Sequence, residues 1–402
     1  MNWDVFVDHR VLLFITASVV FGGFCVWPSV RGLVYVRIRF PRYQRRLNEV
    51  PLRSTKVGVF VPCKGGGAHL EAHLEMICTQ EDVPSYTVTL ITESEEDPAC
   101  EAIQKVVARY PHARHVVAGL AERCGQKNHN LLRGVREDLE SDVLVFCDAD
   151  GHLDRKWLGR LIEPMVRDDV EVVTGFCRVA PQRRTISGTL HAMMVGYQGM
   201  AISNNRIRPV WGGGMAIRRD LFEAWDVEGL WERTVVDDMT LTALVRRYHI
   251  RRVYNPTCIM QLDGIAASVR EVADWFSRQI LFVKFYLRWL WIQALLSYVG
   301  VSVWLATSSA LVARSVVRWD LDGWSWIGVA FLFVVTSWYA SLKYFCRDSH
   351  QSAFRWFVLS PLTHGLWGYV LLRTLFARRV RWRNVEYRLD RRGRVVSVKR
   401  EP

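Results

Sequence analysis

Two aspartates one residue apart end an apolar run near the middle of the chain. The run VLVFCDAD covers residues 143–150, and its two carboxylates belong to Asp148 and Asp150. A continuous apolar run of this kind predicts a strand buried on both faces of a sheet. Carboxylate oxygens at its end are suited to Mg²⁺ or Mn²⁺, and such an ion commonly neutralises a diphosphate. The pair therefore indicates a nucleotide-activated substrate, although a solvated turn after a strand has the same form.

Strand-like and helix-like runs alternate around these aspartates and must position them. The pattern predicts strands at 57–62, 86–92 and 115–117 before the strand that ends at Asp148, and helices at 69–78, 99–110 and 127–139. Alternation of this kind predicts an α/β fold with a mostly parallel sheet. Ligands of such sheets bind at the carboxyl ends of the strands, where Lys64 and Glu93 follow the first two. We therefore expect these side chains and the two aspartates to share one rim.

Seven motifs in order give the chain a family resemblance. They are VFVPCKGGG, LITESEEDPA, GQKNHNLLRGV, VFCDAD, WGGGMAIRRD, VVDDMTL and RQILF. The series covers residues 56–282 and resembles the inverting family 2 glycosyltransferases, with the nearest likeness to the ceramide-glucosyltransferase branch. The segment WRNVEYRL near the C-terminus also resembles the tail of that branch. The resemblance implies a GT-A (Rossmann-like) catalytic domain that uses Mg²⁺ or Mn²⁺. It further implies transfer of a sugar, with inversion, from a nucleotide sugar such as UDP-glucose to a lipid acceptor of the ceramide or sphingolipid kind.

The resemblance assigns the donor side residue by residue. It implies that Glu93 contacts the nucleobase and that Lys127 lies near the diphosphate. Lys64 is assigned to the same donor-binding rim by its position after the first strand. Asp148 would lie near the ribose and the metal, and Asp150 would be the direct metal ligand. Two plainer interpretations stay open, a solvated acidic loop for Glu93 and an exposed helix lysine for Lys127.

The acceptor side is assigned in the same way. The resemblance makes Asp238 the general base, which takes the proton of the attacking hydroxyl, and gives Asp237 a positioning role. Two aspartates before an apolar run also suit a helix N-terminus, so a capping role is the alternative. Trp211, Gly213 and Gly214 would form an acceptor-side loop whose glycines admit a ligand close to the backbone, unless they form an ordinary turn.

The motif RQILF departs from the family pattern Q/R-x-x-R-W. Arg278 is kept, but Leu281 and Phe282 stand where the family has Arg and Trp. We expect Trp275, Arg278 and Gln279 to take over this work, as an aromatic platform and a cation near the diphosphate and the acceptor. The departure argues against a processive polymer synthase, in which the motif is usually intact.

Long apolar segments at both ends predict an integral membrane protein. The chain has 402 residues, 50% of them hydrophobic, with uncharged or nearly uncharged runs at 11–27, 289–313, 324–345 and 356–376. The predicted organisation is a transmembrane helix with a basic flank (1–46), a glycosyltransferase domain (47–267), an interfacial amphipathic helix (268–288), membrane segments (289–376) and a basic tail (377–402). A bacterial inner membrane is favoured over the Golgi.

Basic residues set the expected orientation. Arginines follow the first apolar segment, and the tail holds ten Lys and Arg against three Asp and Glu, so the positive-inside rule puts the domain and the tail in the cytoplasm. Three C-terminal spans would send the tail outside. We therefore expect 356–376, with Pro361, Gly365 and Gly368, to be a broken helix that enters and returns, or to lie in the interface.

Charge and cysteine content limit the classes of partner that we expect for this protein. The net charge of +13 is concentrated beside the membrane segments, where anionic lipids account for it, so no nucleic acid is expected. The nine cysteines are scattered and predict reduced thiols rather than disulfides. No obligate protein partner is evident. The alternatives to a single-sugar transferase are a processive polysaccharide synthase and an inactive transferase fold that serves as a membrane scaffold.

Overall fold

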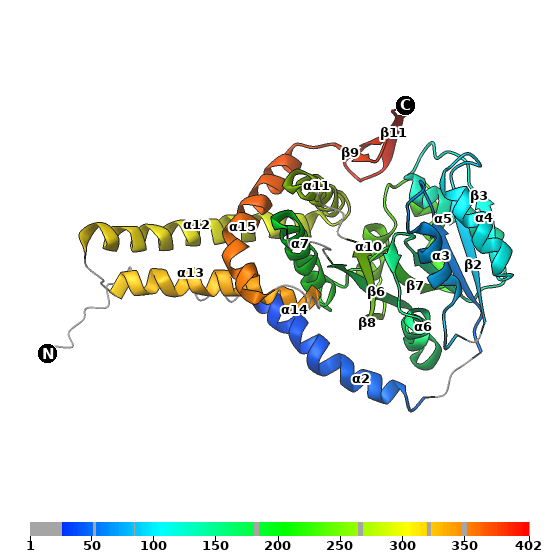
Figure 1. The fold of residues 1–402 in the computed structure, drawn as a ribbon, viewed down its shortest axis with the longest axis horizontal. Coiled ribbons are helices and arrows are strands. Elements are labelled where there is room, and N and C mark those ends of the chain that lie inside the picture. The colour runs from blue at the N-terminus through cyan, green and yellow to red at the C-terminus, as the bar shows by residue number, and fades with distance from the viewer. Residues whose placement is uncertain are drawn as a thin grey trace.

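The structure of the protein is a computed structural model, shown in Figure 1. It describes residues 26–401 except 51–53, 84, 181–184, 264–267, 320–322 and 347–351. Nearly all of the predicted first span, 11–27, therefore lies outside the described residues. Residues 26–34 are helical and run directly into η1 (Tyr35–Arg39) and α2 (Phe40–Leu47).

The first half of the sheet domain follows the predicted alternation of strands and helices. Its elements are β1 (Val57–Pro62), α3 (Leu70–Cys78), β2 (Tyr86–Thr92), α4 (Ala99–Arg109), β3 (Ala113–Val117), α5 (Gln126–Glu137) and β4 (Val143–Cys147). The four strands are parallel and lie in the order β3-β2-β1-β4. All five residues of β4 are buried, as expected for a strand covered on both faces. The carboxyl ends of β1, β2 and β4 therefore meet at one edge.

The second half extends the same sheet. Its elements are β5 (Gly151–His152), α6 (Trp157–Asp168), β6 (Val172–Ala180), α7 (Ile186–Ile202), β7 (Gly214–Arg218), α8 (Arg219–Ala224), α9 (Val227–Trp231), α10 (Asp238–Arg247) and β8 (Arg252–Asp263). The full order is β3-β2-β1-β4-β7-β6-β8-β5, with β7 antiparallel to both neighbours. This large mixed sheet confirms the predicted α/β class. Because β7 runs backwards, Gly214 pairs with Cys147, which brings the glycine loop beside the end of β4.

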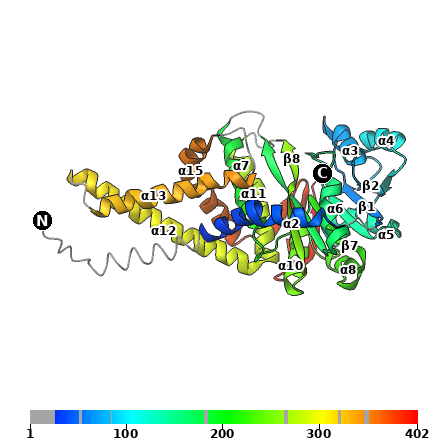
Figure 2. The ribbon, with the colours of Figure 1, turned by 90° about the horizontal axis from the view of Figure 1, so that it is seen from below.

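Helices follow the sheet domain and include a long apolar hairpin. They are α11 (Val269–Tyr286), α12 (Arg288–Arg318), α13 (Gly323–Ser341), α14 (Lys343–Cys346) and α15 (Ala353–Leu375). Figures 1 and 2 both show α12 and α13 side by side, projecting away from the sheet. Among the described residues, Arg288–Arg318 and Trp324–Phe345 are long and apolar enough to cross a membrane.

The segment expected to be a broken helix is continuous in the structure, so that part of the prediction is wrong. α15 runs through Pro361, which leaves the carbonyl of Phe357 without its usual backbone donor. The Ser360 hydroxyl donates to that carbonyl at 2.7 Å and replaces the missing bond. At Gly368, an added Cβ would lie 2.0 Å from the Tyr298 hydroxyl, so this glycine allows α12 and α15 to approach closely. The proline and glycine serve packing rather than a break.

The basic tail folds into a three-stranded antiparallel sheet. Its strands are β9 (Arg379–Trp382), β10 (Val385–Leu389) and β11 (Val395–Arg400), in the order β11-β10-β9. Tyr387 and Leu389 pack with Leu281 and Phe282 of α11 and with Val235, which precedes α10. The helix predicted at 268–288 is thus present as α11, with much of its apolar surface buried against protein. Its contact with a membrane stays a prediction.

Candidate active site

One cavity of about 970 Å³ opens at the carboxyl edge of β1 and β4. Side chains from the sheet edge, from α7 and α11, and from α12, α13 and α15 line it. Ten residues predicted for the site line this cavity: Lys64, Lys127, Asp148, Asp150, Trp211, Gly213, Asp238, Trp275, Arg278 and Gln279. The other three, Glu93, Asp237 and Gly214, do not line it. The ten lining residues therefore converge, although they come from six separate segments of the chain.

Lys127 is the electrostatic centre of the site. Its Nζ lies 2.7 Å from Asp148 Oδ1 and 3.1 Å from Asp237 Oδ2, and it donates to the carbonyl of Gly212 at 3.1 Å. Burial alone lowers the pKa of this lysine, but the two carboxylates outweigh burial and raise it, so Lys127 stays charged. The interpretation of Lys127 as an exposed helix lysine is therefore wrong, because its side chain is largely buried and paired with carboxylates.

A glycine lets Lys127 reach this position. Gly125, which precedes α5, donates its N–H to the carbonyl of Thr234 at 2.9 Å. An added Cβ at Gly125 would lie 2.1 Å from the Val235 carbonyl oxygen, which is too close for any other residue. The start of α5 and the segment before α10 therefore touch through backbone, which joins Lys127 to the aspartates that begin α10.

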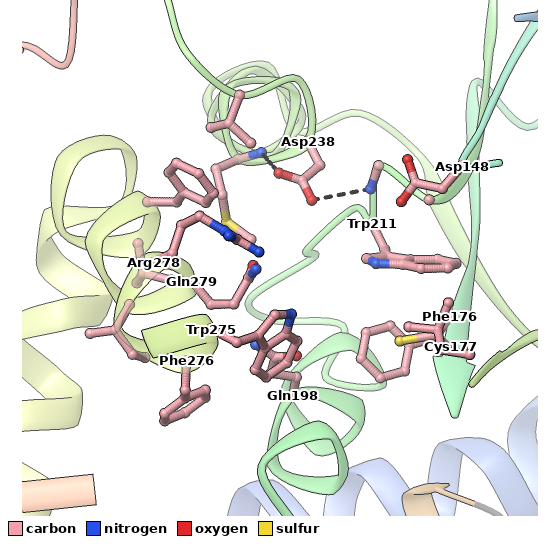
Figure 3. A pocket seen from close by; sticks show the side chains of 18 of the residues that line it. Asp148, Phe176, Cys177, Gln198, Trp211, Asp238, Trp275, Phe276, Arg278 and Gln279 are labelled. Carbon is pink, nitrogen blue, oxygen red and sulfur yellow. Dashed lines mark hydrogen bonds between the residues drawn. The ribbon is translucent and has the colours of Figure 1, made fainter. Parts of the chain in front are cut away.

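Asp238 points into the cavity and is held by two backbone donors. Its Oδ2 accepts from Gly212 N at 3.1 Å and its Oδ1 from Met239 N at 2.6 Å, as the dashed lines of Figure 3 mark. Burial, followed by the neighbouring Asp237 charge, raises the pKa of Asp238 to about 7. A carboxyl group with this pKa is well matched to accepting a proton near neutral pH.

Asp237 has a different environment. It is almost completely buried, at 1% exposure, and its charge faces Lys127 rather than the cavity. It occupies the N-cap position of α10 but makes no side-chain capping hydrogen bond. The capping alternative therefore fails for this residue, and its contacts are those of a group that positions Lys127.

Asp148 and Asp150 differ in exposure. Asp148 is partly buried beside Lys127, and burial raises its pKa to about 6, whereas Asp150 is exposed at the cavity rim. The described residues contain no cluster of three or more His, Cys, Asp or Glu side chains placed to hold a metal ion. Asp148 and Asp150 supply two carboxylates at the cavity, and proteins commonly bind Mg²⁺ through one or two carboxylates together with substrate phosphates and water. Three carboxylates, Asp148, Asp237 and Asp238, face the single Lys127, so a further cation suits the charge of the site.

Lys64 and Glu93 form an ion pair after β1 and β2. The Lys64 Nζ lies 2.7 Å and 2.9 Å from the two carboxylate oxygens of Glu93. The Glu93 side chain is only 16% exposed, so the solvated-loop interpretation does not hold. The pair sits at the edge where the parallel strands end, but only Lys64 lines the cavity.

The helix α11 supplies the wall opposite the aspartates. Figure 3 shows Trp275, Arg278 and Gln279 across the pocket from Asp238 and Asp148. Burial lowers the pKa of Arg278 to about 10, and its Nε has no hydrogen-bond partner among the described residues.

The glycine loop closes the wall beside β4. Trp211 lines the cavity with its ring 5.7 Å from that of Phe176, and Gly213 accepts from the Asp148 N–H at 3.3 Å. Gly214 lies behind them, where an added Cβ would be 2.9 Å from the Trp157 ring.

The C-terminal sheet contributes residues that the sequence did not place in the site. Trp382, Arg383, Val385 and Tyr387 line the cavity. The motif WRNVEYRL resembled a family tail, and the alternation in VEYRL is typical of a strand. Neither signal indicated that this sheet lies against a domain more than a hundred residues earlier in the chain.

Comparison with solved structures finds distant similarities. A mannosyltransferase from Pyrobaculum calidifontis in complex with GDP-Man and Mn²⁺ is similar at 15% identity and a TM-score of 0.49, over 87% of this chain and 99% of that chain. A glucosyl-3-phosphoglycerate synthase from Mycobacterium tuberculosis in complex with Mn²⁺, UDP and phosphoglyceric acid is similar at 15% identity and a TM-score of 0.38, over 57% and 78%. Likenesses this distant carry no argument about what this chain binds.

A family model gives the stronger result. The model of glycosyl transferase family 21 matches residues 25–395, which includes the sheet domain, the helices after it and most of the C-terminal sheet. The chain belongs to glycosyl transferase family 21, and it is a glycosyltransferase that uses a nucleotide-sugar donor.

Proposed function

We propose that this glycosyltransferase moves one sugar from a nucleoside-diphosphate donor, such as UDP-glucose, onto a lipid acceptor of the ceramide or sphingolipid kind at the cytoplasmic face of a membrane. One observation carries the proposal. The cavity that holds Asp148 and Asp238 is also lined by Leu290 and Val301 of α12 and by Trp338 of α13. A polar reaction centre and the apolar helices therefore share one space.

The helices themselves support a membrane location. In the most apolar stretch of each, only 17% of Arg288–Arg318 and 28% of Trp324–Phe345 is buried inside the protein. Helices of a soluble core bury most of their apolar surface, and these two expose it. A lipid could enter sideways from the bilayer along α12 and α13 and present its hydroxyl group to Asp238. A soluble sugar acceptor would need no such apolar approach.

Both ends of the hairpin support the orientation. α15 packs against α7, α11 and α13, and the C-terminal sheet lies against the catalytic domain, so the chain returns to the side from which α12 began. Two crossings between residues 288 and 345 would produce this return. With two crossings there, the C-terminal tail would lie on the same side of the membrane as the sheet domain without a re-entrant segment.

The residues of this chain account for a transfer with inversion. The acceptor hydroxyl oxygen attacks the anomeric carbon, Asp238 takes the hydroxyl proton, and the bond from that carbon to the diphosphate breaks with its electrons on the diphosphate. Lys127 lies where it can stabilise negative charge on the leaving group. Asp148 and Asp150 would hold a divalent ion, which when bound neutralises the diphosphate. Asp237 keeps Lys127 in place and charged.

The test is a product analysis with purified protein in lipid nanodiscs. Labelled UDP- and GDP-sugars are supplied with candidate lipids, and we expect label in a lipid extract carrying one sugar. Asp238→Asn should lower product formation by roughly 10²–10⁴-fold. Asp220→Asn, which changes an exposed aspartate on α8, should not lower it. A long polymer as product, or label only on a soluble acceptor, would contradict the proposal.

A pair of variants on α12 tests the lipid approach separately. Ala294 lines the cavity, whereas Leu296 on the same helix is 64% exposed and points away from it. Ala294→Trp should fill the path and reduce lipid glycosylation while nucleotide binding is unchanged. Leu296→Trp, the matched control, should do neither. Equal activity of the two variants would rule out this path for the acceptor.

A further inference from the structure

The C-terminal sheet is fixed to the catalytic domain at several points around the donor end of the cavity. Tyr387 accepts from the backbone N–H of Gln126 at 3.1 Å, and Arg400 Nη2 donates to the Gln126 side chain at 2.8 Å. At the other edge, the Val395 N–H donates to the carbonyl of Arg233 at 2.8 Å. These bonds hold the sheet beside the residue before Lys127 and the segment before α10. The sheet is thus a fixed wall of the site.

Its β9–β10 turn reaches over the loop that follows β1. Arg383 Nη1 donates to the carbonyl of Lys64 at 2.8 Å, and Lys64 Nζ lies 3.4 Å from the Asn384 Oδ1. Arg383 has φ of 54°, a left-handed conformation that costs a residue with a side chain roughly 1 kcal/mol and that suits Gly or Asn better. An arginine therefore occupies a strained turn position from which it points to the cavity.

A second arginine lies close by and also lacks an acidic partner. Arg278 enters the cavity from α11, and its guanidinium carbon is 5.5 Å from the centre of the Trp382 ring. Each of the two guanidinium groups repels the other, and no described carboxylate forms an ion pair with either. Two neighbouring cations that lack a carboxylate are a suitable site for a ligand with two negative charges.

We propose that the β9–β10 turn completes the donor site, with Arg383 and Arg278 together binding the diphosphate of the nucleotide. Trp382 is a positioning residue, because its ring holds the Arg278 guanidinium by a cation–π contact. The inference rests on the proposed function, since it assumes a nucleoside-diphosphate donor. The location favours the diphosphate over the acceptor, because the turn lies at Lys64 and Gln126 and not at the α12–α13 end of the cavity.

The experiment measures equilibrium binding to the full-length protein in nanodiscs with Mn²⁺, using UDP, GDP, UMP and inorganic pyrophosphate. Arg383→Asn removes the guanidinium but suits the turn. We expect it to weaken UDP and pyrophosphate binding about tenfold, as expected for loss of one charge-assisted hydrogen bond, and UMP binding less. Arg383→Lys should restore part of the loss, because it returns the charge without the planar fork. Trp382→Leu should weaken UDP binding in the same direction.

The matched control is Arg379→Gln on the same sheet. Arg379 pairs with Glu386 and does not line the cavity, so its loss makes the same charge change without touching the ligand. If Arg383 only pins the Lys64 loop, Arg383→Asn will weaken UDP and UMP equally and Arg383→Lys will restore nothing, which overturns the inference. Unchanged UDP binding in Arg383→Asn also overturns it and leaves the proposed function standing. If the unaltered protein binds neither UDP nor GDP, the proposed function fails, and this inference fails with it.

Discussion

Replacement of Asp238 by asparagine separates the proposed proton acceptor from the other contacts of this side chain. Asparagine has the same size and keeps one oxygen for Gly212 N or Met239 N, but it cannot take a proton. We expect donor and metal binding to remain, while transfer falls by roughly the 10²–10⁴-fold typical of a lost general base. Asp237→Asn is the comparison and should lose less, because Asp237 faces Lys127 and not the cavity.

The pKa of Asp238 makes a second, independent part of this prediction. Burial and Asp237 raise that pKa to about 7, so at pH 6 only about a tenth of the carboxyl groups are ionised and able to accept a proton. For the unaltered enzyme, kcat/KM should therefore fall about tenfold for each pH unit below 7. The residual activity of Asp238→Asn should lack this dependence.

Stability should change in the opposite direction to activity. The folded-state pKa of Asp238 lies above its ordinary value of 3.8, so the folded protein holds this proton more tightly than the unfolded chain does. The resulting stabilisation is complete below pH 3.8 and is lost as pH rises to about 7. Above pH 7 the buried charge costs at most about 4 kcal/mol, which asparagine removes. Asp238→Asn should therefore be more stable than the unaltered protein at pH 8.

The assay combines initial rates of lipid glycosylation between pH 5.5 and 8.5 with denaturant unfolding at pH 8. An inactive but stabilised Asp238→Asn is the expected result. If Asp237→Asn loses more activity than Asp238→Asn, the assignment of the base is wrong. If both variants lose stability in proportion to activity, the aspartates serve the structure and not proton transfer.

Three further predictions concern the metal, the central lysine and the orientation. Asp150→Ala should abolish metal-dependent UDP binding without lowering the melting temperature, because the side chain is exposed; UDP binding that survives a chelator would contradict this. Lys127→Met should lower the free energy of unfolding by roughly 3–5 kcal/mol, because it leaves buried carboxylates without a cation; denaturant titration measures it, and an unchanged midpoint would refute the central role of this lysine. Reporters at Arg46 and after Pro402 should both be active in the cytoplasm, and a reporter after Pro402 that works only outside would refute the orientation.

The residues at the sheet edge could be predicted from the sequence, because their position depends only on the pattern of the residues next to them in the chain. Apolar runs of strand length followed by Lys64, Glu93 and Asp148 are enough to place these residues at the ends of parallel strands. The helix predicted from residue 127 begins at Gln126, one residue away. In this region each element is specified by neighbours along the chain.

The opposite wall could not be predicted in the same way. Its position depends on the path of the chain through α11, α12, α13 and α15, which no local pattern encodes. In the sequence, Leu281 and Phe282 appear only as a departure from the family motif Q/R-x-x-R-W. In the structure they pack against residues of β10. Pro361 likewise predicted a break in the helix. The Ser360 hydroxyl that replaces the missing hydrogen bond can be recognised only from the structure.

The docking of the C-terminal sheet has a consequence for how the protein is made. During synthesis, the sheet domain and its aspartates leave the ribosome first, and α12, α13 and α15 follow. The wall containing Trp382 and Tyr387 can assemble only after those helices have been made and the chain has come back to the domain. A newly made chain therefore carries the acidic residues of the cavity long before this wall of the cavity is in place. We therefore expect transfer activity only in chains whose C-terminal sheet has docked against the sheet domain.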